Sequence, residues 1–173
     1  MVSLVLVTAG CGADFATVEP DNPSRVADGL VVTRADGSSY EMNDAVAECR
    51  TDPDHPGVQI VRLNAPADAG TERRRETFLY AEVVPGVLGT RELPLDERDS
   101  GAGPSDLTLF GVDSQTRNEL SASLRQATGT VTVVEATCDP EPRIAIHVDA
   151  TLASEVGQPG ERVRGSLASV PGR

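Results

Sequence analysis

Apolar and polar residues alternate most clearly near the end of the chain, between residues 143 and 152. Every second side chain there is apolar, from Ile144 to Leu152, and most of the others are polar, which is the period of a β-strand with one buried face. A second alternating segment covers residues 162–169. Turn-forming residues at 154–160 separate the two segments, so the pattern predicts a hairpin with a long loop.

A segment rich in β-branched residues, 129–138, precedes this hairpin and predicts another strand. Its alternation breaks at Val133 and Val134, two apolar neighbours that indicate a β-bulge. A turn with two prolines, 139–142, then leads to the next strand. Together the three strands predict an antiparallel meander.

Shorter apolar runs earlier in the chain predict five more strands. They cover residues 29–34, 39–49, 58–64, 76–84 and 107–112. Asp36-Gly37 lies between the first two runs and is a strong hairpin signal. The polar stretch 85–106 is too long for an ordinary connection, so it forms a mobile loop or contains a further element. Residues 113–126 predict a loop with at most one helical turn, because their apolar face is thin.

Eight short strands joined by turns predict an all-β fold, an antiparallel β-sandwich that forms a single domain over residues 29–173. An open barrel is the alternative architecture. The 16 Gly and 12 Pro among 173 residues argue against a helical bundle.

The first ten residues are mostly apolar and end in small residues directly before Cys11. Such a stretch is typical of a secretory signal peptide. The sequence Val7-Thr8-Ala9-Gly10-Cys11 resembles the lipobox of bacterial lipoproteins, in which the cysteine thiol is joined to diacylglycerol. The resemblance implies that residues 1–10 are a lipoprotein signal peptide and that Cys11 is the lipidated residue. The alternative is a buried first strand with an ordinary cysteine.

Residues 11–28 show neither the strand nor the helix period and contain scattered acids and two prolines, which is typical of a flexible tether. The combined pattern resembles small lipoproteins of high-GC bacteria that display a disulfide-linked β-sandwich outside the membrane. This resemblance implies a protein on the extracytoplasmic side of the cell membrane. The membrane contact would be the lipid anchor at Cys11.

Lipidation of Cys11 would leave Cys49 and Cys138 as the remaining cysteines. An exported chain meets an oxidising environment, so we expect these two to form a disulfide. Free buried thiols and a metal pair are the alternatives. The metal pair is disfavoured because the sequence has no C-x-x-C or C-x-x-H spacing.

Charge excludes one class of partner. Acidic residues number 27 against 15 basic residues, all of them arginine, and the formal net charge is −12. A nucleic-acid backbone requires a positive surface, so we expect no nucleic-acid binding. The sequence also has no apolar run near the roughly 20 residues that a membrane-spanning helix needs.

Residues with catalytic chemistry are scarce. His147 lies on the polar face of a predicted strand, where an exposed imidazole without a function is expected. His55 lies in a proline-rich loop with Asp52 and Asp54, which could contact a cation but do not match a calcium loop. The G-x-S-x-G motif of serine hydrolases is absent, and Ser166 should point outward from its strand. We therefore predict no catalytic residue, no metal site and no cofactor.

Two functions remain open. The first is a non-enzymatic display or protein-interaction domain, anchored in the cell envelope by lipid and facing an unknown envelope protein. The alternative is an envelope module, or an enzyme, that binds a small ligand or metal in a pocket between sheets or under the 85–106 loop. The basic cluster 73–75 predicts a solvated loop that could touch an anionic partner. We expect the first function, because no residue type or spacing supports the second.

Overall fold

The computed structural model describes residues 29–53, 55–67, 77–95 and 106–169. Within these ranges the regular elements are eleven β-strands, and none is a helix. They are β1 (Gly29–Thr33), β2 (Ser39–Met42), β3 (Val46–Thr51), β4 (Gln59–Pro66), β5 (Phe78–Val83), β6 (Gly89–Glu92), β7 (Leu107–Asp113), β8 (Asn118–Ser121), β9 (Thr128–Thr137), β10 (Arg143–Ser154) and β11 (Glu161–Ala168).

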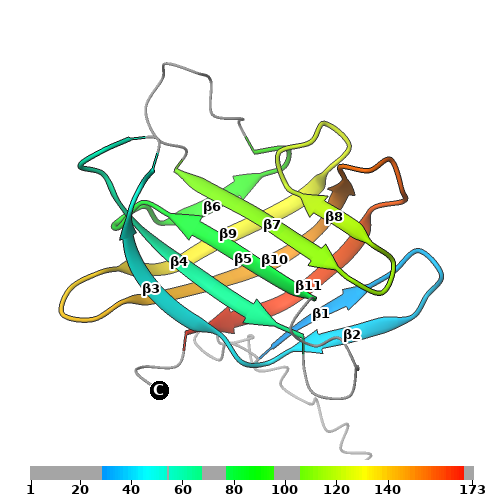
Figure 1. The fold of residues 1–173 in the computed structure, drawn as a ribbon, viewed down its shortest axis with the longest axis horizontal. Helices are drawn as coiled ribbons and strands as arrows, with labels where there is room; N and C mark the ends of the chain where they lie inside the picture. Colours follow the sequence, from blue (N-terminus) through cyan, green and yellow to red (C-terminus); the bar gives the residue numbers. More distant parts are fainter. Residues whose placement is uncertain (1–28, 54, 68–76, 96–105, 170–173) are drawn as a thin grey trace, which may run out of the picture.

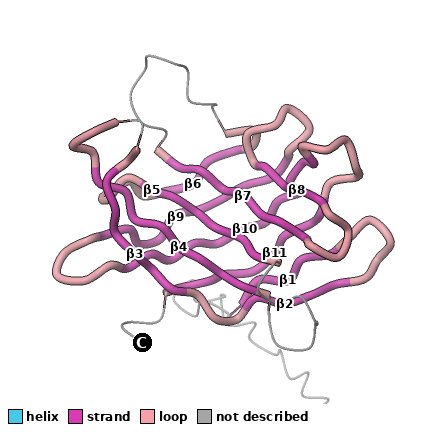
Figure 2. The backbone as a smooth tube through the Cα atoms, in the orientation of Figure 1, coloured by secondary structure: helices cyan, strands magenta, loops and turns pink. Residues whose placement is uncertain are grey.

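The strands form one continuous antiparallel sheet that curls into a half-barrel (Figure 1; Figure 2). Its order is β2-β1-β11-β10-β8-β7-β5-β4-β3, and β9 and β6 extend it from β10. The long strand β10 joins the two halves because its one edge pairs first with β9 and then, at Ala153 and Ser154, with β8. The first strand of the sheet, β1, pairs with the last, β11.

The prediction of an all-β antiparallel fold is confirmed, whereas the predicted count of eight strands is wrong and the sandwich is not confirmed. The run 39–49 is two strands, β2 and β3, because the chain turns away at residues 43–45. The stretch 85–106 contains β6, which is the further element considered there. Residues 113–126 contain β8, so the prediction of a loop with at most one helical turn is wrong there.

The predicted meander of β9, β10 and β11 is confirmed. Ile146 in β10 pairs with Val133, whereas its neighbour Ala145 pairs with Glu135. Val134 is therefore the extra residue of a β-bulge, and its side chain is 53% exposed. The bulge keeps Val133 and Ala136 facing the core despite the broken alternation.

The predicted hairpin at Asp36-Gly37 is also confirmed. The Arg34 amide donates to the Ser38 carbonyl across 2.9 Å, and the Ser38 amide donates to the Asp36 carboxylate across 2.8 Å. Gly37 has a φ of 85°, which is the left-handed region that glycine adopts without steric cost. The turn is thus specified by its own residues.

Aliphatic side chains from the inner face of the sheet form a single core. β10 contributes most visibly, because Ile144, Ile146, Val148, Ala150 and Leu152 all point inward, as the alternation predicts. Three rings, in contrast, stay outside this core and remain partly exposed on the outer face of β5 and β7. They are Phe78, Tyr80 and Phe110.

Cys49 on β3 and Cys138 just after β9 lie at disulfide distance, with 5.9 Å between their Cα atoms and a sequence separation of 89. This is the predicted pair. The contact connects two segments that no strand pairing joins. It therefore holds the end strand β3 against the other half of the sheet.

Cys11, the signal peptide 1–10 and the tether 11–28 lie outside the described residues, as does the arginine cluster 73–75. The lipidation of Cys11 therefore stays a prediction. In the part of the chain that the structure describes, there is no helix of the length and apolarity that crossing a bilayer requires.

Candidate functional site

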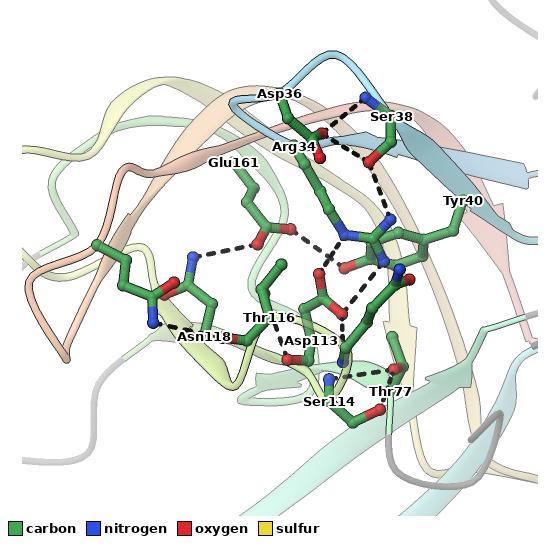
Figure 3. A network of polar contacts seen from close by, with 12 residues as sticks. Arg34, Asp36, Ser38, Tyr40, Thr77, Asp113, Ser114, Thr116, Asn118 and Glu161 are labelled. Carbon is green, nitrogen blue, oxygen red and sulfur yellow. Dashed lines mark hydrogen bonds and ion pairs between the residues drawn. The ribbon is translucent and has the colours of Figure 1, made fainter. Parts of the chain in front are cut away.

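Three hairpin turns lie together at one end of the half-barrel. They connect β1 with β2, β7 with β8, and β10 with β11, and they cover residues 34–38, 114–117 and 155–160. We call these three turns the loop end. Beneath them lies a cluster of polar side chains, the polar network, which Figure 3 shows in close-up. Its central members are Arg34, Tyr40, Asp113, Asn118 and Glu161.

An ion pair between Arg34 and Asp113 is the strongest contact in the network. Both carboxylate oxygens of Asp113 accept from the guanidinium, one from Nε and the other from Nη2 at 3.2 Å. The Arg34 side chain is 8% exposed and that of Asp113 is 0% exposed. The guanidinium carbon also lies 4.6 Å from the centre of the Tyr40 ring, a favourable cation–π distance. The pair joins the first turn to the end of β7.

Asp113 also shapes the second turn. Its Oδ1 accepts from the Gln115 amide at 2.9 Å, and its carbonyl accepts from the Thr116 hydroxyl at 3.5 Å. The neighbouring residue Ser114 contacts Thr77, just before β5, through hydroxyl groups 2.8 Å apart. The network therefore reaches from the turns into the connection that enters β5.

Glu161, the first residue of β11, is the second buried carboxyl group. The residue is 2% exposed. Its Oε2 accepts from the Tyr40 hydroxyl at 3.4 Å, and its Oε1 accepts from Asn118 Nδ2 at 3.1 Å. Asn118 Nδ2 also donates to the Pro159 carbonyl at 3.1 Å, which fixes the third turn. Among the described residues, Glu161 forms no ion pair.

The two carboxyl groups differ in their electrostatics. Burial by itself raises the pKa of Asp113, but the hydrogen bonds and charge of Arg34, with help from Thr116 and the Gln115 amide, hold it below the usual 3.8.

Burial also raises the pKa of Glu161, and here the net pKa stays above the usual 4.5 because only Asn118 and Tyr40 donate to it. The Asp113 charge adds to that rise, and the Arg34 charge opposes it. Arg34 in turn has a raised pKa, chiefly through its hydrogen bond to Asp113.

The polar network is suited to holding the turns in place rather than to catalysis. A nucleophile or general base must reach a substrate, whereas the two carboxyl groups are sealed from solvent. Arg34 is already committed to Asp113. The network therefore fixes the three turns relative to one another from below.

His147 is exposed, as predicted, and it faces Ser166 across β10 and β11. Ser166 shares that face of the sheet but is only 8% exposed, so the prediction holds for its direction and not for exposure to solvent. His147 Nδ1 and Ser166 Oγ are 2.8 Å apart. Both residues lie within paired strands, because His147 is also opposite Thr132 of β9 and Ser166 is also opposite Gly29 of β1. The contact between His147 and Ser166 is therefore a cross-strand pair of the kind that stabilises a sheet.

Among the described residues, one acid contacts His55. Its Nδ1 lies 3.2 Å from the carboxylate of Asp52, which is buried, while Asp54 lies outside the described residues. Across the described ranges, no three or more His, Cys, Asp or Glu residues gather where they could hold a metal ion.

The outer face of β4, β5 and β7 carries the three rings. Tyr80 is 5.3 Å from Phe110 and 6.3 Å from Phe78, measured between ring centres. The Arg62 guanidinium covers the Tyr80 ring at 4.6 Å and, with Arg50, binds the Glu82 carboxylate. Contacts of this kind across strands stabilise a sheet, which accounts for this surface without a ligand.

The sequence interpretation missed the polar network, although a signal was present. Asp113 continues the buried phase of Leu107 and Leu109, and Glu161 begins the buried phase of Val163 and Leu167. A charged residue in the apolar phase at a strand end predicts a buried, partnered charge. The partner, however, comes from another hairpin and cannot be found from one strand.

No family model, no curated protein and no solved structure matches the chain.

Proposed function

We propose that this chain is a non-enzymatic interaction domain, anchored by lipid at Cys11 on the extracytoplasmic side of the cell membrane, whose loop end contacts an envelope protein. The observation that carries the proposal is that one buried network fixes three exposed hairpin turns together. Turns positioned by a rigid scaffold are a common way to build a binding surface. Prior ordering also lowers the entropy cost of binding.

The direction of β1 supports this proposal. The strand begins at Gly29, where the segment 1–28 joins the domain, and ends at the first turn of the loop end. The end of β11 lies close to Gly29 as well, because Ser166 pairs with Gly29. The loop end is therefore at the far end of β1 from the attachment of the N-terminal segment, and an anchor at Cys11 would leave it free to face outward.

The exposed residues of the loop end suit contact with a protein. They are mainly small or uncharged polar residues, with single charges at Asp36, Arg117 and Glu155. Val156 adds an apolar side chain, 52% exposed, at the tip of the third turn. Adaptable polar groups around an apolar contact are typical of a protein-binding surface.

Site-specific crosslinking tests the loop end. A photo-crosslinking amino acid in place of Val156 should give a defined adduct with an envelope protein in intact cells. The matched control is Val31, also an exposed valine but on the outer face of β1, and it should give no adduct. Equal adducts at the two positions, or adducts only at Val31, would contradict the assignment of the loop end.

Mass spectrometry tests the anchor. The non-reduced protein from its native membrane fraction should begin at Cys11, carry the mass of a diacylglycerol and acyl group, and lack the hydrogens lost in one disulfide. Cys11→Ala should release the domain from the membrane fraction without lowering its melting temperature. An unmodified chain that begins before Cys11 would refute the lipid anchor.

A further inference from the structure

Glu161 combines two properties that rarely occur together, deep burial and the absence of a counter-ion. The residue is 2% exposed, and the two groups that donate to its oxygens are neutral, the Tyr40 hydroxyl and the Asn118 amide. A buried carboxylate without a cation is costly, because neutral donors replace only part of the lost hydration. Protonation removes that cost.

The charged groups around Glu161 do not change this balance. The charge of Arg34, from the first turn, lowers the pKa of Glu161, but the guanidinium is hydrogen-bonded to Asp113 and the net pKa of Glu161 stays raised. Asp113, from β7, repels a second negative charge. Tyr40 comes from β2 and Asn118 from β8, and burial raises the pKa of the Tyr40 hydroxyl so that it stays neutral. Asn118 Oδ1 is also buried without a hydrogen-bond partner among the described residues, so the surroundings of Glu161 are not fully satisfied.

Glu161 lies where its protonation state can affect all three turns. It is the residue at which the third turn enters β11, and its donor Asn118 is the residue at which the second turn enters β8. Tyr40 lies in β2, two residues after the first turn. All three turns therefore meet at this one carboxyl group (Figure 3).

We propose that Glu161 is a proton-binding site that sets how firmly the loop end is held. The neutral carboxyl group fixes the three turns together, and the ionised carboxylate loosens them, so the loop end is more rigid in mildly acidic than in neutral solution. The proton site itself follows from the buried geometry. Only its consequence for partner binding rests on the proposed function.

The direction of the effect follows from linkage. The pKa of Glu161 in the folded protein is raised above its ordinary value, so between the two values the folded state binds more protons than the unfolded state. Stability and local order therefore increase as the pH falls through the folded pKa. Asp113 acts in the opposite sense, because its stabilisation is lost only as the pH falls through a pKa below 3.8. The two effects occupy separate pH windows.

Amide hydrogen exchange measures the proposed effect without any partner. In the wild-type protein, protection of the amides at 34–38, 114–117 and 155–160 should be greater at about pH 5 than at about pH 7.5. The change should approach about tenfold for each pH unit that separates the folded and unfolded titrations. Glu161→Gln should keep high protection at both pH values. The matched control Glu41→Gln, an exposed glutamate on β2, should behave like the wild type.

Tyr40→Phe provides a second, independent test. The substitution keeps the ring beside Arg34 but removes the hydroxyl that donates to the ionised Glu161, so the transition should move to higher pH. The proposal is overturned if wild type and Glu161→Gln show the same pH dependence, or if Tyr40→Phe leaves the transition unmoved. A positive result here with no crosslinking at Val156 would refute the proposed function alone.

Discussion

Replacing Asp113 with alanine should lower the free energy of unfolding at neutral pH by about 3–5 kcal/mol, because Arg34 would keep its charge in a buried site without a counter-ion. The second turn would also lose the hydrogen bond that its Gln115 amide makes with the carboxylate. Urea denaturation with the disulfide intact would measure the loss. We expect it to exceed the effect of any single substitution at the exposed tips of the turns.

A double variant separates the charge from the packing. Arg34→Met with Asp113→Leu removes both charges and should recover most of the stability lost in Asp113→Ala, because apolar residues can replace a buried ion pair. Arg162→Ala is the control, since Arg162 pairs with Asp149 at the exposed surface and its loss should change the stability little. If Asp113→Ala is no more destabilising than Arg162→Ala, the network does not hold the loop end together.

Replacing Cys49 with serine should cost about 4–5 kcal/mol in the free energy of unfolding, because the disulfide closes a loop of nearly 90 residues in the unfolded chain. Cys138→Ser should cost the same, and the two losses should not add. Thermal or urea unfolding under non-reducing conditions measures them. Reductant should destabilise the wild type by a similar amount and leave Cys49→Ser unchanged. A melting temperature that Cys49→Ser does not alter would show that the disulfide does not stabilise the fold.

Sequence patterns predict the fold where neighbouring residues carry the information. The strands β10 and β11 each bury every second side chain along most of their length, and their pairing follows from one turn. The bulge at Val134 and the turn at Gly37 are visible for the same reason. The pair Cys49 and Cys138 could be predicted because an expected lipid at Cys11 leaves these two as the remaining cysteines.

The strands that the sequence did not reveal are short and depend on distant partners. β6 and β8 have four residues each, and β6 pairs with β9, which lies some forty residues further along the chain. Four residues contain too few repeats to distinguish a strand from a loop. The polar network was missed for a related reason. Arg34 and Asp113 are 79 residues apart, and only the curvature of the sheet brings them together.

The pairing of β1 with β11 has a consequence for how the chain acquires its structure. Residues 29–33 cannot complete their strand ladder until residues 162–166 have been synthesised, so the earliest and latest parts of the domain must meet before the sheet is complete. Contacts between such distant segments slow folding, since the entropy of closing the intervening chain is lost before the contact forms. A product that ends before β11 would leave the facing edges of β1 and β10 unpaired, and such edges readily recruit other chains. Incomplete chains of this protein should therefore aggregate rather than form a smaller folded domain.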